Sequence, residues 1–183
     1  TVQLRNNTYN ALSDKNLILI HKIEQLGHRI GLHICPDMSS NKNKITEEIL
    51  QEINILQNYY GFYIDRFAFH RPNLRPKLLS WYLEIPGLIN CNGKNYFHYF
   101  TTRPDKLDVT YLSDSNHQWK SGHPISLDFN KTKKLQINTH PFSWTEKGFE
   151  SYGNFLSLIK ERNDEMLYDM STENKAFPKE LLL

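Results

Sequence analysis

The stretch GHRIGLHICPD, residues 27–37, decides how the fold is predicted. Gly27 is positioned to end a helix. An apolar run follows it and ends at Pro36, so the stretch predicts a short buried strand. His33 lies near the end of this strand, and Asp37 follows four residues later. In parallel α/β folds, ligands bind at the C-terminal ends of strands, so this pair is a candidate metal or catalytic site.

Helices and strands alternate on both sides of this stretch. Apolar residues recur at helical spacing in residues 17–26 and 45–60, with Gly27 and Gly61 placed to end these helices. A last helix is predicted over residues 149–168, and the tail after it is predicted to be loosely held. Strands are predicted at residues 1–5, 29–34, 67–70, 88–89, 96–100, 111–112 and 135–139. This alternation is typical of an α/β fold with a parallel sheet, open or closed.

The composition sets limits on the class of protein. The chain has 183 residues, 39% of them hydrophobic and 23% charged, which suits a single domain over residues 1–183. A formal net charge of +2 gives no electrostatic reason to expect nucleic acid as a partner. No apolar run approaches the ~20 residues of a membrane-spanning helix. Two cysteines, Cys35 and Cys91, are too few for a disulfide framework, which favours a reducing compartment, the cytoplasm.

Polar side chains gather where four of the predicted strands end. They are His33 with Asp37, His70 with Arg71, Asp114 between two serines, and His140. A single histidine at a strand end is most often a satisfied polar residue. Three at equivalent positions indicate a shared site, because the C-terminal strand ends of α/β folds line one mouth. Histidine offers a nitrogen that binds zinc or transfers a proton near neutral pH.

These segments resemble, in order, the motifs of the polysaccharide deacetylase family (carbohydrate esterase family 4, the NodB-homology fold). Residues 27–33, GHRIGLH, resemble the family's GHEIGLH segment, and residues 69–72, FHRP, resemble its F-R-x-P segment. Residues 111–119, YLSDSNHQW, resemble its later Asp/Trp motif. Residues 135–141, LQINTHP, resemble its closing strand, which ends in a catalytic histidine. The resemblance covers about residues 1–145.

The resemblance implies a distorted or incomplete (β/α) barrel and a metal-dependent N- or O-deacetylase that acts on a carbohydrate, such as a precursor of a surface polysaccharide. In this family one aspartate and two histidines hold a divalent ion, usually zinc, which polarises the acetyl carbonyl and activates a water molecule. An aspartate deprotonates that water, an arginine orients the aspartate, and a histidine protonates the leaving group. An aromatic groove holds the sugar ring.

Carried over to this chain, the resemblance implies a metal site in its first half. His33 matches the first metal histidine. Asp37 stands where the family has its second histidine; a carboxylate can also bind zinc, and a turn-forming loop residue is the alternative. His70 has no clear counterpart and is either a substitute ligand or a residue held by packing or a backbone hydrogen bond. Arg71 matches the orienting arginine, with an ion-pairing surface arginine as the alternative.

In the second half of the chain the resemblance implies acid catalysis and sugar binding. His140 matches the general acid. Asp114 and Trp119 match the Asp/Trp motif at the groove wall, so we expect Asp114 in the catalytic set and Trp119 against the sugar, unless Trp119 is a core aromatic. Trp144 is expected at the same rim. His33, Arg71, Asp114 and His140 are thus expected to converge on one mouth.

One family motif has no counterpart here. The adjacent Asp-Asp pair, which supplies the base and a metal ligand, does not occur in the sequence. Residues 1–4 align best with the strand after that motif, so the first strand is expected either upstream of Thr1 or lost. In the first case we expect a deacetylase-like hydrolase. In the second case the alternative holds, a non-catalytic carbohydrate-binding domain on the same fold.

Overall fold

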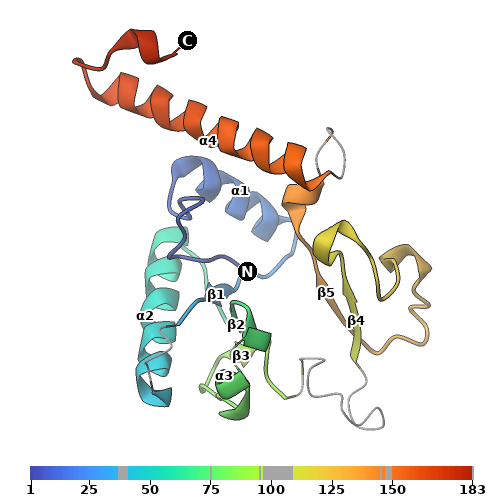
Figure 1. The fold of residues 1–183 in the computed structure, drawn as a ribbon. Coiled ribbons are helices and arrows are strands. Elements are labelled where there is room, and N and C mark those ends of the chain that lie inside the picture. Colours follow the sequence, from blue (N-terminus) through green and yellow to red (C-terminus); the bar gives the residue numbers. More distant parts are fainter. Residues whose placement is uncertain are drawn as a thin grey trace. The chain divides into compact units, whose positions relative to one another are not determined.

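The fold is described from a computed structural model of the chain (Figure 1). The structure describes residues 1–36, 41–74, 76–94, 96, 109–144, 146 and 150–182. Two compact units make up the chain, Thr1–Val109 and Thr110–Leu183, and each is described by itself. The single domain expected over residues 1–183 stays a prediction.

The first unit contains a parallel sheet with the strand order β1-β2-β3. The strands are Leu32–Ile34, Arg66–Phe69 and Ile89–Asn90. Leu32 pairs with Phe67 and Ile34 with Phe69, and all four side chains are buried. Because side chains alternate along a strand, His33 projects from the opposite face of β1. The predicted parallel sheet is therefore confirmed. The strand predicted at residues 1–5 is reduced to one parallel bridge between Val2 and Leu32.

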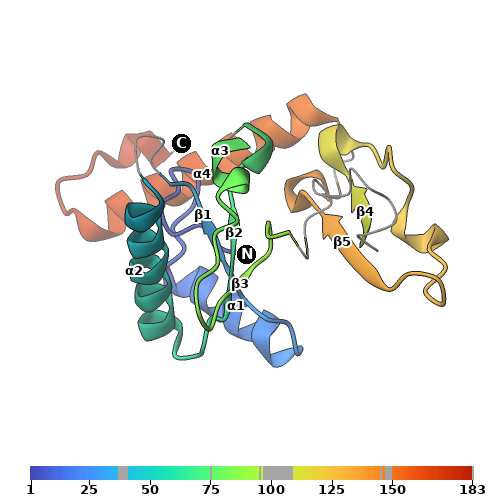
Figure 2. The same cartoon turned by 90° about the horizontal axis from the view of Figure 1, so that it is seen from below.

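Helix α2 (Lys42–Tyr60) covers the buried face of this sheet, and it lies beside β1 in both views (Figures 1 and 2). It ends at Gly61, whose φ of 75° is a left-handed conformation that glycine adopts at low cost. The predicted helix and its glycine cap are confirmed. Its buried apolar residues, which pack in the core with the sheet, are Ile45, Ile49, Ile53, Leu56 and Tyr60.

Helix α1 (Asp14–Gln25) includes most of the stretch with helical spacing, residues 17–26, but buries fewer of its apolar side chains than predicted. Ser13 caps it by accepting a hydrogen bond from a backbone N–H of the first turn. Ile20 is buried, whereas Ile23 and Leu26, which the spacing predicts to face inward, are 42% and 74% exposed. The helix therefore contacts the core along a narrower stripe than its apolar pattern predicts.

Between β2 and β3 the chain forms a 3-10 helix, Pro72–Leu74, and a short helix, α3 (Pro76–Ser80). Buried side chains of this segment, Leu78 and Leu83, complete the core of the first unit. Of the strand predicted at residues 96–100, only Tyr96 lies within the described residues.

The second unit holds a two-stranded sheet and a long helix. Strand β4 (Val109–Ser113) pairs with β5 (Lys134–Asn138), and the two lie side by side in Figures 1 and 2. Helix α4 spans Ser151–Glu173, and a 3-10 helix, Lys179–Leu182, follows it. The tail after Ser171, predicted to be loose, is therefore partly helical. Phe149, predicted in this helix, lies outside the described residues.

The fold class is α/β. The described residues form an open three-stranded parallel sheet and a separate two-stranded sheet, and within them no barrel closes. None of the described helices has both the length and the apolar character needed to cross a bilayer.

Candidate active site

Asp114 and His140 form a hydrogen-bonded dyad in the second unit. Asp114 directly follows β4 and His140 lies two residues beyond β5, so the pairing of these strands brings together two residues 26 positions apart. Nδ1 of His140 lies 2.6 Å from Oδ1 of Asp114. The backbone N–H of His140 also donates to both carboxylate oxygens at 3.0 Å. Of the predicted catalytic residues, these two are thus in direct contact.

The carboxylate of Asp114 is buried, and both of its oxygens accept hydrogen bonds. The residue is 3% exposed, and the indole N–H of Trp144 donates to Oδ2 at 3.1 Å. Burial by itself would raise the pKa of Asp114. The hydrogen bonds from the backbone and ring of His140 and from Trp144 outweigh burial and hold this pKa below its usual value. Asp114 is therefore an ionised, fixed hydrogen-bond acceptor near neutral pH.

This arrangement determines how the ring of His140 can act. An ionised carboxylate can only accept hydrogen bonds, so Nδ1 carries the proton that faces Asp114. Nε2 is then the nitrogen left for proton transfer, as in other carboxylate–histidine pairs. The side chain of His140 is 40% exposed, so a substrate can reach it. The dyad can thus accept a proton on Nε2 and release it again.

A pocket of 240 Å³ adjoins the dyad within the second unit. It is lined by Asp114, Asn116, His117, His140, Phe142, Ser151 and Phe155. Phe142 lies against Phe155 with ring centroids 5.0 Å apart, and this pair forms an apolar wall. The lining of the pocket therefore combines an apolar aromatic pair with two imidazoles.

His117 is a residue of this pocket that the sequence analysis missed. Its ring meets Phe142 edge to face at 5.3 Å, and among the described residues its buried Nδ1 has no hydrogen-bond partner. Asn116 and His117 have φ values of 57° and 58°, in the left-handed region that costs free energy for residues other than glycine. Asparagine tolerates this region, so Asn116 was a weak signal for a turn, but nothing local predicted the position of His117.

The predicted metal histidines lie side by side in the first unit. The ring centroids of His33 and His70 are 5.2 Å apart at an interplanar angle of 38°, and Oγ1 of Thr1 lies 3.3 Å from Nδ1 of His33. Burial, together with the neighbouring charge that His70 would carry, lowers the pKa of His33 to about 4. His33 is therefore neutral at physiological pH, which is the form of imidazole that binds metal.

Two further residues of the first unit, Asp37 and Arg71, were predicted to belong to the site. Asp37 lies outside the described residues. Within the described residues, no group of three or more histidine, cysteine and acidic side chains could hold a metal ion. Arg71 follows His70 at the end of β2, is exposed, and has a φ of 48°. Its backbone carbonyl accepts a hydrogen bond from the N–H of Leu74 and so starts the 3-10 helix.

Trp119 differs from Trp144 in its surroundings. It packs edge to face on His123 with ring centroids 5.3 Å apart, whereas Trp144 donates a hydrogen bond to Asp114, and neither tryptophan is among the residues that line the 240 Å³ pocket. The sugar contacts predicted for Trp119 and Trp144 stay predictions. The convergence expected of His33 and Arg71 with His140 involves both units and stays a prediction.

Comparisons of this chain with models of protein families, with curated proteins and with solved structures found no match.

Proposed function

We propose that the protein is a hydrolase of the polysaccharide deacetylase type that removes acetyl groups from a carbohydrate. The observation that carries this proposal is the 2.6 Å contact between Asp114 and His140 beside a pocket. A buried carboxylate that fixes one imidazole nitrogen leaves the other for proton transfer to a substrate. The resemblance of residues 27–33 and 135–141 to that family suggests the reaction class. It also suggests that the fold is a distorted or incomplete (β/α) barrel.

In the proposed reaction, water adds to the carbonyl carbon of the acetyl group, and the C–N or C–O bond to the sugar then breaks. Protonated His140 delivers its Nε2 proton to the departing nitrogen or oxygen, so that a neutral amine or alcohol leaves and acetate remains. Asp114 balances the positive charge of the ring through Nδ1. The proton that the water loses goes to solvent in this scheme, because the Asp-Asp motif that supplies a base in the family has no counterpart in the sequence.

His33 and His70 are the residues that would hold the divalent ion. Their rings lie side by side with centroids 5.2 Å apart, and neutral imidazole is a form of histidine that binds zinc. A bound zinc ion would polarise the acetyl carbonyl and lower the pKa of its water. Asp37, which lies outside the described residues, is proposed as a further ligand.

The proposed substrate is a sugar-bearing precursor of a surface polysaccharide, handled in the cytoplasm. The sequence has two cysteines, Cys35 and Cys91, which are too few for a disulfide framework, and this suits a reducing compartment. The pocket beside the dyad supports an acylated substrate, since its lining combines the apolar rings of Phe142 and Phe155 with imidazoles that can donate a hydrogen bond to a carbonyl oxygen.

Acetate release from N-acetylated and O-acetylated oligosaccharides, with and without added zinc, tests the proposal. His140→Ala and Asp114→Asn are each expected to lower the rate at least about 100-fold, because one removes the acid and the other its orientation. His28→Ala, which removes an exposed histidine, is the matched control and should leave the rate unchanged. A chain that binds oligosaccharide but releases no acetate under either condition contradicts the proposal and favours a carbohydrate-binding domain.

A further inference from the structure

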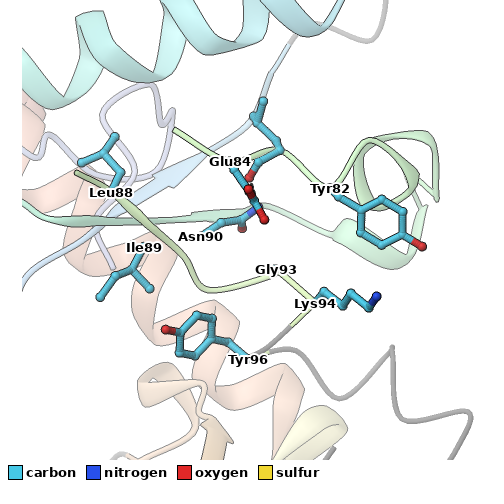
Figure 3. A pocket seen from close by; sticks show the side chains of 9 residues that line it. Tyr82, Glu84, Leu88, Ile89, Asn90, Gly93, Lys94 and Tyr96 are labelled. Carbon is cyan, nitrogen blue, oxygen red and sulfur yellow. Dashed lines mark hydrogen bonds between the residues drawn. The ribbon is translucent and has the colours of Figure 1, made fainter. Parts of the chain in front are cut away.

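A second pocket, of 390 Å³, lies in the first unit beside β3 (Figure 3). Pockets of small-molecule sites start at about this size and combine apolar walls with a few polar groups. Leu88 and Ile89 are apolar residues of its wall. The polar groups of the wall include two tyrosines and two charged side chains, which are Tyr82, Tyr96, Glu84 and Lys94. None of these residues belongs to the dyad or to the histidine pair.

The backbone around this pocket is held by Asn90. Its Nδ2 donates to the carbonyl of Leu83 at 3.0 Å, and its Oδ1 accepts from the N–H of Asn92 at 2.9 Å. Both polar ends of this amide thus join β3 to the segments on either side. At Gly93 a Cβ atom would lie 2.8 Å from the carbonyl oxygen of Asn90, so the close approach requires glycine there. The wall is therefore built by specific contacts.

The two tyrosines lie at opposite ends of the pocket in Figure 3. They are about half exposed, Tyr82 at 52% and Tyr96 at 48%. Tyr82 has a φ of 46°, a conformation that is strained for a bulky side chain and that persists only where the surroundings impose it. The ammonium of Lys94 lies 5.9 Å from the centroid of the Tyr82 ring. This arrangement places an aromatic surface and a donor together at one end.

The two charged side chains of the pocket favour a ligand without net charge. Glu84 can only accept hydrogen bonds and Lys94 can only donate them, so together they suit a group that does both, which is a hydroxyl. Their opposite charges give no net preference for a cation or an anion. Aromatic faces, which are negative, attract the weakly positive C–H faces of a saturated ring. The ligand should therefore have no net charge, carry hydroxyl groups and contain a saturated ring whose C–H faces can pack on the tyrosines.

We propose that this pocket binds one uncharged hexopyranose ring, with Tyr82 and Tyr96 packing on the ring and Glu84 and Lys94 binding its hydroxyl groups. The proposal adds a binding site to the first unit and does not depend on the dyad. It differs from the sugar contact that the sequence predicts at Trp119 and Trp144, because those residues lie in the second unit.

The test is a titration of the full chain, followed by NMR, with methyl β-D-glucopyranoside and its N-acetylglucosamine counterpart. Saturable shifts of the amide signals of Leu83 and Gly93 are expected with at least one of the two. Tyr82→Ala and Tyr96→Ala should each weaken binding about tenfold, and Glu84→Gln should weaken it about threefold. Tyr152→Ala, which removes an exposed tyrosine on α4, is the control and should leave binding unchanged.

Three outcomes would overturn the proposal. These are no saturable binding of either glycoside, binding that survives both tyrosine substitutions, and glucuronate or glucosamine binding more than about tenfold tighter than the neutral glycoside, which would show selection for charge. Circular dichroism spectra of each variant confirm that it is folded. Because binding is read without acetate release, a chain that binds the glycoside but releases no acetate overturns the proposed hydrolase alone. The reverse result overturns the pocket alone.

Discussion

The indole N–H of Trp144 donates to Oδ2 of Asp114 at 3.1 Å, while the other carboxylate oxygen of Asp114 contacts the ring of His140. The sequence predicts Trp144 as a sugar contact. The structure gives it a second role, since its hydrogen bond fixes the carboxylate that orients His140. The ring is 58% exposed, so it can fix Asp114 and still offer a face to a sugar.

Trp144→Phe keeps the aromatic ring and removes the donor. We expect acetate release to fall about three- to tenfold, because one hydrogen bond to a charged group is lost. That bond lowers the pKa of Asp114, so its loss raises this pKa and moves the acid limb of the pH–rate profile to higher pH. Trp81→Phe, at a tryptophan of the first unit to which no role in the site is assigned, is the control and should leave the profile unchanged. A profile with an unmoved acid limb would show that Trp144 acts only on the sugar.

The lowered pKa of His33 predicts a pH dependence of folding stability. The folded-state pKa is about 4 and the unfolded value about 6.5, so the unfolded chain binds more protons between these two values. The contribution of His33 to the free energy of unfolding is therefore fully present above pH 6.5. It decreases by up to about 3 kcal/mol as the pH drops towards 4. Urea unfolding at several pH values in the presence of a chelator measures this. His33→Gln should flatten the dependence, and a variant with the same slope as the wild type contradicts the prediction.

Zinc should stabilise the folded chain if His33 and His70 bind it. Binding to the folded state alone adds about 2.7 kcal/mol at a zinc concentration 100 times the Kd, which thermal unfolding detects as a higher Tm. His33→Ala and His70→Ala should each remove most of this gain, and a chelator should reverse it. His28→Ala, the exposed histidine, should keep it. An equal gain in the double variant would assign zinc to other residues.

Gly31 is expected to be intolerant of a side chain. A Cβ atom there would lie 2.6 Å from Cγ of Arg66 and 3.1 Å from the carbonyl oxygen of the same residue. Gly31→Ala should lower the free energy of unfolding by about 1–3 kcal/mol, because β1 must move away from β2. Adding Arg66→Ala should restore only part of this loss, since the main-chain oxygen remains. Full recovery in the double variant would mean that only the side chain was in the way.

The elements predicted well are those whose signals are local. The apolar spacing of residues 45–60 and the glycine after them specify α2 and its end without reference to other parts of the chain. For α1 the same spacing overestimates burial at Ile23 and Leu26, since which face packs depends on the neighbouring elements. Closure of a barrel is a property of the whole strand set, and local patterns do not determine it.

The candidate site was predictable in part for the same reason. Asp114 and His140 were found as polar residues at strand ends, but their contact depends on the pairing of β4 with β5 across 26 positions. His117 and Tyr82 were missed, because each is placed by a left-handed backbone conformation that favours glycine and that neither residue type signals. Such positions become visible only when the backbone is known.

The contact between Asp114 and His140 depends on the register in which β4 and β5 pair. Both partners sit just past the ends of two strands, so a one-residue slip of β5 along β4 would carry His140 about 3.3 Å away and turn its side chain to the other face. Selection for proton transfer would therefore act on every residue that sets this alignment, including ones that never touch a substrate. An insertion inside either strand would change this alignment and separate the pair.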